Sequence, residues 1–304
     1  MALQSSGQIS LQDIQNEFGG SHPISLSEYY GSDTVPSSGA ISLSDFYGTS
    51  NVIYTIATGG TISYDGDYKI HTFTGSGTFS VSQVGTDATA DYLIIAGGGG
   101  AGSQRGGGGA GGYKTSYGSE TSGGSCGNQT AKTLSATSYS IVVGGGGASG
   151  STSNYSLPAS NGSNSSALGI TCIGGGGGGG GTGCSNHGSS GGSGGGAGRY
   201  DYESCFYGAN GGSATGCGNS GSGNRDILTG AGGGAGGAGS GGSGGAGLYS
   251  SITGSSVYRA GGGGQYCCGG SSQAQGVNKG SGCGSIFGTC NGHSGVVIIR
   301  YKYQ

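Results

Sequence analysis

The sequence has no tryptophan, only three prolines, and few charged residues, which make up 8% of its 304 residues. Three prolines are too few for collagen, and the glycines come in tracts rather than at every third position, which excludes a triple helix. With 83 glycines and so little charge, the composition fits neither an ordinary globular domain nor a charge-driven disordered chain. Something other than a conventional core must therefore order the chain.

Basic clusters and long apolar runs are also absent. The net charge is −3 and no Lys/Arg cluster appears, so we expect no nucleic-acid partner. The longest aliphatic stretch, residues 295–299, is far shorter than a bilayer span, so we expect no membrane insertion. Residues 1–4 open no signal peptide, which predicts synthesis as a soluble protein in a host cytoplasm.

A solvated Gly/Ser linker is the remaining simple alternative. Against it stand 19 tyrosines, 9 cysteines and short Val/Ile strands between the glycine tracts. A flexible spacer needs none of these, so we expect a folded chain.

Residues 1–50 contain three copies of a short repeat. In each copy a serine precedes an acidic residue by three positions, the pattern of a helix-starting capping box. An aromatic residue and a glycine then end each copy. Units this short bury little core alone, which favours packing on another protein; a self-contained helical cluster is the alternative. The serine and acidic pairs are Ser10/Asp13, Ser25/Glu28 and Ser42/Asp45.

Residues 51–96 switch to the pattern of strands. Runs rich in β-branched and aromatic residues alternate with Gly59-Gly60, Asp65-Gly66 and Gly75-Ser76-Gly77, which are hairpin signals. This predicts a small antiparallel β module. Two longer apolar runs, 92–96 and 296–301, are expected to pair, so that residues 294–304 complete the module.

Residues 97–293 hold the glycine tracts, separated by polar loops. Consecutive glycines favour the polyproline-II-type helix, which has three residues per turn and no internal hydrogen bonds. Such helices satisfy their backbone groups only by bonding to one another side by side. The predicted fold class is therefore all-β: short helical N-terminal repeats, a small antiparallel β module, and a stacked polyglycine-II helix array.

Several segments resemble the glycine-rich domain of phage proteins. The phrase at residues 38–48 (SGAISLSDFYG) is similar to openings of marine and cyanophage structural proteins. The distal adhesins of T-even-type phages likewise stack polyglycine-II helices, whose loops touch the host receptor. The chain departs from those adhesins in its N-terminal repeat, its cysteines and its β module. The glycine-rich matches are 92–100 (YLIIAGGGG), 139–147 (YSIVVGGGG), 170–174 (ITCIG) and 295–301 (GVVIIRY).

No arrangement of catalytic residues emerges, so we expect no enzyme and no cofactor. Matches to G-x-S-x-G and G-x-G-x-x-G are meaningless in a chain this rich in glycine. Cys184 with His187 and Cys290 with His293 share the spacing C-x2-H and could together bind zinc. Structural disulfides are the favoured interpretation, and we predict no metal site.

All nine cysteines lie within residues 126–290, where a hydrophobic core is missing. Cross-links there would supply what burial cannot. The adjacent Cys267 and Cys268 should pair with different partners. The disulfide candidates are Cys126, Cys172, Cys184, Cys205, Cys217, Cys267, Cys268, Cys283 and Cys290.

Loops with aromatic and charged residues between the tracts are the candidates for binding. Tyrosine offers rigid contact area with a polar group, a combination that recognition loops favour. The alternative is that these rings cap the ends of the glycine helices. The receptor-contact candidates are Arg199, Tyr200, Asp201, Tyr202, Glu203, Phe206, Tyr207, Tyr113, Tyr117 and Tyr266.

The resemblance implies a bacteriophage tail-fibre or tip adhesin on the virion surface. Residues 1–50 would dock on other virion proteins, and the loops would bind a host-surface glycan or protein. The protein would be a homo-oligomer or would dock on a multimeric fibre. The alternatives are a virion decoration protein without a receptor and an ice-binding protein, although the irregular tract lengths argue against the latter.

Overall fold

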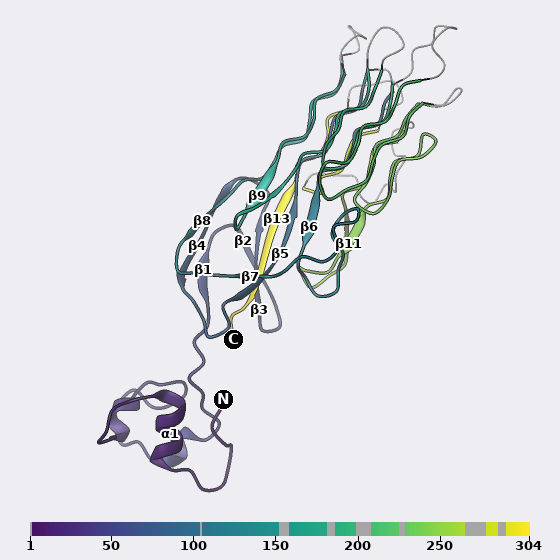
Figure 1. The fold of residues 1–304 in the computed structure, drawn as a ribbon. Helices are drawn as coiled ribbons and strands as arrows, with labels where there is room; N and C mark the ends of the chain where they lie inside the picture. The colour runs from purple at the N-terminus through teal and green to yellow at the C-terminus, as the bar shows by residue number, and fades with distance from the viewer. Residues whose placement is uncertain are drawn as a thin grey trace. The chain divides into compact units, whose positions relative to one another are not determined.

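The computed structural model describes residues 2–103, 105–151, 158–180, 186–198, 208–224, 229–264, 278–284 and 290–304. The chain forms two compact units (Figure 1). Unit 1 comprises Met1–Tyr54 and Val84–Asp87, and unit 2 comprises Thr55–Gln83 and Ala88–Gln304.

Unit 1 consists of three short helical segments, each started by a capping box. They are α1 (Leu11–Phe18) and two 3-10 turns, η1 (Leu26–Tyr29) and η2 (Leu43–Phe46). In all three the predicted serine and acidic pair forms the box, which confirms this part of the sequence prediction. Gly31 and Gly48, both at φ +73°, follow the two short turns. A left-handed glycine there ends each turn.

The three segments bury a common core. Phe18, Tyr29 and Phe46 form a triangle of rings with centroids 5.9 to 6.2 Å apart, and Ile14 beside them is fully buried. The expectation that these repeats depend on another protein for a core is therefore wrong. Each segment is too short alone, but together they bring enough apolar side chains to exclude water.

The carboxylates of residues 1–54 serve this local structure. Each of the five accepts a hydrogen bond from a backbone N–H, at 2.7 to 3.0 Å. Three of them complete the capping boxes, while Asp33 and Glu17 bind the N–H groups of Ser50 and Asn51. These carboxylates therefore stabilise unit 1 by accepting hydrogen bonds from its backbone.

Unit 2 begins with two antiparallel sheets. The first has the order β1-β4-β8, and the second has the order β2-β3-β13-β5-β6, with β7 also pairing with β5. Two hairpins, β9-β10 and β11-β12, form separate two-stranded sheets. The strands are β1 (Ile56–Thr58), β2 (Thr61–Asp65), β3 (Tyr68–Phe73), β4 (Gly77–Gln83), β5 (Thr89–Ile95), β6 (Tyr113–Thr115), β7 (Lys132–Thr133), β8 (Ser138–Ile141), β9 (Ser165–Ala167), β10 (Ile170–Cys172), β11 (Leu248–Ser250), β12 (Val257–Arg259) and β13 (Val296–Lys302).

The predicted pairing of the two long apolar strands is confirmed. β5 and β13 run antiparallel, from Val296 opposite Ile95 to Tyr301 opposite Ala90. Leu93, Ile95 and Ile298 on these strands are fully buried. This pair therefore forms the centre of the larger sheet and its core.

Only one of the three predicted hairpins exists. Gly66 lies in the turn between β2 and β3, but residues 59–60 and 74–76 lead from one sheet to the other. Gly59 and Gly60 both have positive φ, and a Cβ on Gly59 would lie 2.0 Å from the carbonyl oxygen of Thr78. The glycine pair therefore allows a tight corner between sheets, which a sequence pattern does not distinguish from a hairpin.

Beyond the sheets the glycine tracts form a bonded array, as predicted. In the segment 97–102, successive N–H groups donate to three different neighbours and the pattern repeats every third residue. This is the signature of a helix with three residues per turn. Gly97 and Gly100 donate to the segment 158–164, Gly98 and Ala101 to 290–295, and Gly99 and Gly102 to 106–112.

The segment 106–112 lies at the centre of this array. Its N–H groups donate to three neighbouring segments, and its carbonyls accept from three others. Six neighbours correspond to hexagonal packing, in which no inner backbone group is left without a partner. Glycine is required for this closeness: a Cβ on Gly108 would lie 2.1 Å from the carbonyl oxygen of Gly99.

Candidate functional site

The array gives unit 2 one end where many segments meet. At that end Gly102 bonds to Gly106, Ala101 to Cys290, and Gly198 to Asn186. Six of the seven gaps between described residues of unit 2 have both flanking residues there. The sheets and the C-terminus lie at the opposite end of unit 2 (Figure 1). This end of the array, away from the sheets (Figure 1), is called the loop-bearing end below.

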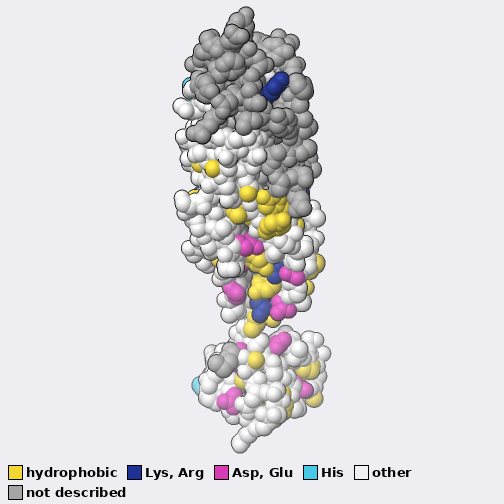
Figure 2. All heavy atoms as spheres, turned by 90° about the vertical axis from the view of Figure 1, so that its right-hand side faces the viewer, with side chains coloured by type: hydrophobic (Ala, Val, Ile, Leu, Met, Phe, Trp, Pro, Cys, Tyr) yellow, Lys and Arg dark blue, Asp and Glu magenta, His cyan; other side chains and the backbone are white. Residues whose placement is uncertain are grey.

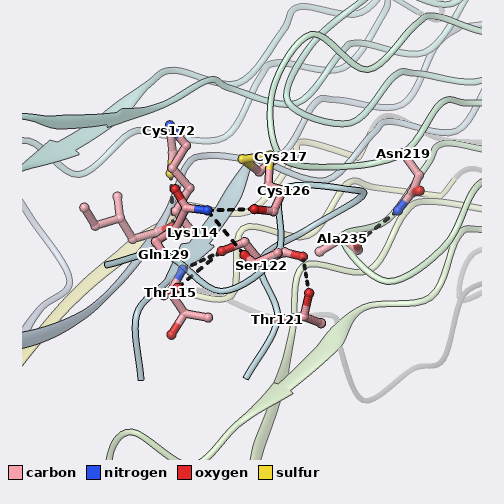
Figure 3. The surroundings of a disulfide bond; sticks show 12 residues. Lys114, Thr115, Thr121, Ser122, Cys126, Gln129, Cys172, Cys217, Asn219 and Ala235 are labelled. Atoms are coloured by element: carbon pink, nitrogen blue, oxygen red, sulfur yellow. Dashed lines mark hydrogen bonds between the residues drawn. A yellow bond between two sulfur atoms is a disulfide. The ribbon is translucent and has the colours of Figure 1, made fainter. Parts of the chain in front are cut away.

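A disulfide ties the edge of the array to the larger sheet. Cys126 bonds to Cys217, and Gln129 Nε2 donates to the carbonyl oxygen of Cys126 at 2.8 Å (Figure 3). Asn219, two residues beyond Cys217, donates to the carbonyl of Ala235 at 2.9 Å. The bond therefore links the loop after β6 to a segment that itself bonds into the array.

The remaining cysteine candidates divide into three groups. Cys283 bonds to Cys290, which joins two adjacent glycine segments at the loop-bearing end. Cys172 is a buried free thiol, whose Sγ donates to the carbonyl of Ile94 at 3.2 Å; burial raises its pKa to about 12. Such a thiol is unreactive at neutral pH. Cys184, Cys205, Cys267 and Cys268 lie outside the described residues.

The disulfide of Cys290 bears on the zinc alternative. A cysteine bonded to Cys283 has no thiolate to offer a metal. His187 Nδ1 accepts from the N–H of Asn210 at 2.8 Å, which leaves it engaged in the array. Within the residues that the structure describes, no three His, Cys, Asp or Glu side chains gather as a metal site would need.

Tyr113 lies in the core rather than in a binding loop. It is the first residue of β6, and its side chain is fully buried. This burial raises the pKa of its hydroxyl. A ring without solvent exposure has no surface for a receptor, so Tyr113 is withdrawn as a contact candidate. In β6 Tyr113 and Thr115 are buried and Lys114 between them is half-buried, which is the two-residue period of a strand.

Tyr117 has a structural partner. It is half-buried against the same core, and the guanidinium of Arg300 lies 5.2 Å from its ring centroid. Arg300 also lies 4.2 Å from the centroid of Tyr68 and binds Asp65 at 2.7 Å. Arg300 follows four apolar residues of the same strand, and this position was the signal in the sequence for a buried, paired charge.

The other receptor-contact candidates belong to segments outside the described part of the chain. Arg199, Tyr200, Asp201, Tyr202, Glu203, Phe206, Tyr207 and Tyr266 lie outside the described residues. Of their described neighbours in the chain, Gly198 donates its N–H to the carbonyl of Asn186 in the array. Gly198 and Gly208 flank the densest aromatic stretch at the loop-bearing end.

A cavity of about 440 Å³ lies beside Gly208. Its polar side chains are those of Asn210, Ser222, Asn224 and Ser240, and the rest of its lining is glycine and alanine. Asn224 is fixed by bonds to the N–H of Ala209 and the carbonyl of Gly198. Amides and hydroxyls on a rigid backbone suit a small neutral polar ligand rather than an ion.

The described surface of the array has few charged or apolar side chains. On the face in Figure 2, coloured side chains gather toward the sheets, whereas the described part of the array is largely white. The array itself therefore offers a partner little to bind. No helix among the described residues is long and apolar enough to cross a bilayer.

The sequence matches a known protein family. A family profile described as a glycine-rich domain matches residues 72–302. This range takes in both halves of the central strand pair and the whole array. No curated protein matches the sequence.

Proposed function

The chain belongs to the glycine-rich domain family, and from the resemblance of residues 38–48 and of the glycine-rich segments to phage structural proteins we propose that it is a bacteriophage virion protein of the tail-fibre or tip-adhesin kind. In this proposal the array is a rigid support, and the loops at its end bind a glycan or protein on the host surface. Residues 1–50 dock on other virion proteins. The protein acts on the virion surface and is not an enzyme.

One observation carries the proposal: the array directs most of its loop-flanking residues to a single end. Binding loops act best on a scaffold that fixes them, because less conformational freedom is then lost on binding. The lattice of backbone bonds and the Cys283–Cys290 disulfide provide such a scaffold. The polar cavity is lined in part by Gly208, Ala209 and Asn210, which directly follow the aromatic stretch 199–207 in the sequence.

The aromatic stretch provides the test of receptor binding. Replacing Tyr200, Tyr202 and Tyr207 together with Ala should lower the attachment of particles to host cells, because binding energy concentrates in a few tyrosine anchors. Tyr249→Ala, at an exposed tyrosine of β11, is the matched control. Thermal unfolding of each purified variant should match wild type. Unaltered adsorption of the triple variant would remove the stretch from the binding site, and loss of folding would favour the role as a cap.

Docking through residues 1–50 has its own test. Deleting these residues should leave unit 2 folded and abolish incorporation into particles, because unit 1 has a separate core. A truncated protein that still assembles would contradict the docking role. Labelling the protein on intact virions distinguishes an adhesin, which must lie at a fibre tip, from a decoration protein on the head or tail.

A further inference from the structure

Strand β2 (Thr61–Asp65) is an open edge of the larger sheet. It pairs with β3 on one side, and no other segment of the described chain pairs with its second side. Thr61, Ile62, Ser63 and Tyr64 are all exposed, Tyr64 at 59%. An edge with unpaired backbone groups is a template for another strand.

The other edges near it are closed or guarded. At the far side of the same sheet, Gln129 N–H donates to the carbonyl of Thr115. In the smaller sheet, the edge strand β1 has a register shift at Ile56, and Lys69 Nζ donates to the carbonyl of Ala57 at 3.0 Å. Bulges, lysines and prolines are the usual protection of an edge. β2 has none of them.

The register with β3 determines which groups of β2 face outward. The pair of Asp65 and Tyr68 closes a two-residue turn, and residues that exchange hydrogen bonds alternate along an antiparallel pair. Thr61, Ser63 and Asp65 therefore bond to β3. The N–H and C=O groups of Ile62 and Tyr64 point away from the sheet.

We propose that two copies of this protein associate by antiparallel pairing of β2 with β2. The strand is symmetric about Ser63, with an apolar residue on each side and a polar residue beyond. Pairing about Ser63 places Ile62 opposite the partner's Tyr64, and the reverse, so that the four outward-facing backbone groups of each strand are satisfied. The same patch serves both copies, as a two-fold interface requires.

Side chains on one face add to this pairing. Tyr64 and Tyr303 lie with ring centroids 5.0 Å apart, and Ile62 shares the face of Tyr64. The pairing joins the two patches into one apolar stripe. A ladder of five residues is small beside a standard interface of about 1,600 Å², so the dimer is weak and reversible. It depends on β2 alone and is independent of any role in a virion.

Sedimentation over a range of concentrations tests the association. We expect wild type to shift from monomer to dimer as concentration rises. The double variant Ile62→Lys/Tyr64→Lys places like charges opposite each other and should raise the dissociation constant about tenfold or more. Tyr249→Lys, at the similarly exposed tyrosine of β11, should leave it unchanged. A wild type that stays monomeric, or a double variant that dimerises like wild type, would overturn the proposal.

Cross-linking tests the register. In the proposed pair Ser63 faces the partner's Ser63, so Ser63→Cys should form a covalent dimer on mild oxidation. Thr61→Cys should not, because Thr61 lies opposite the partner's Asp65. Wild type measures the background from the native cysteines. Equal cross-linking of the two variants, or none by Ser63→Cys above wild type, would show that the strands do not pair in this way.

Discussion

Gly176 lies inside the array, where adding one methyl group tests the packing directly. Its N–H donates to the carbonyl of Ser193 and its carbonyl accepts from Gly109, both at 2.8 Å. A Cβ at this position would lie 2.0 Å from the carbonyl oxygen of Ser189, and real Cβ contacts are almost never under 3.0 Å. Gly176→Ala must therefore move two segments apart by about 1 Å.

The cost follows from the bonds that this movement breaks. It stretches the bonds from Gly176 to Ser193 and from Gly195 to Ser189, and each buried group left unpaired costs about 1–3 kcal/mol. We expect unit 2 to lose about 4 kcal/mol of unfolding free energy, and the midpoint of thermal unfolding to fall by about 10 °C.

Two glycines of another tract provide controls. At Gly145 nothing lies within 4 Å of an added Cβ, so Gly145→Ala should change stability by less than about 1 kcal/mol. At Gly146 a Cβ would lie 1.8 Å from the carbonyl of Gly292, but this glycine is exposed, so its segment can shift and the loss should be intermediate. Calorimetry of the three variants gives the order. Equal changes at Gly176 and Gly145 would refute close packing of the segments.

Three further predictions concern other parts of the chain. Phe46→Ala should destabilise unit 1 by about 3–5 kcal/mol and leave the transition of unit 2 in place, which two-probe urea unfolding would detect. Burial lowers the pKa of His71 below its usual 6.5, so the unfolded chain binds the proton more readily; stability should fall as pH drops below about 6.5, and His71→Gln should flatten that slope in urea titrations at several pH values. Replacing both cysteines of Cys126–Cys217 with Ser should cost about 2 kcal/mol more than the same change at Cys283–Cys290, because the first closes a loop of 91 residues and the second one of 7; equal losses in calorimetry would contradict the loop-length argument.

Local signals in the sequence predicted local structure well. The three capping boxes each need only a serine and an acid three residues apart, and all three form. The pairing of β5 with β13 was predictable because both are apolar runs long enough to need burial on two faces. The common core of unit 1 was not, because each repeat was judged by its own length rather than with its neighbours.

Which glycine segments lie together could not be predicted. Residues 106–112 bond to six neighbours, but glycine has no side chain to distinguish one neighbour from another. The strands and disulfides at the ends of the segments determine which segments become neighbours. Strand β6, for example, directly follows residues 106–112. For the candidate site, composition was enough to select the aromatic loops. Tyr113 was misassigned because the sequence alone does not distinguish a buried tyrosine from an exposed one.

The three-residue repeat of the array has a consequence for how such a gene can change. Successive residues of a segment bond to different neighbours. Inserting or deleting one glycine therefore rotates the rest of the segment by one third of a turn, and two glycines rotate it by two thirds, so that the later bonds no longer match. Inserting or deleting three residues, which correspond to nine nucleotides, is one full turn and restores the pairing of hydrogen-bonding groups. Length variation within tracts should therefore accumulate in steps of nine nucleotides, whereas the connections at the loop-bearing end tolerate codons added in any number. The lattice thus constrains which mutations persist and leaves the loops open to rapid diversification.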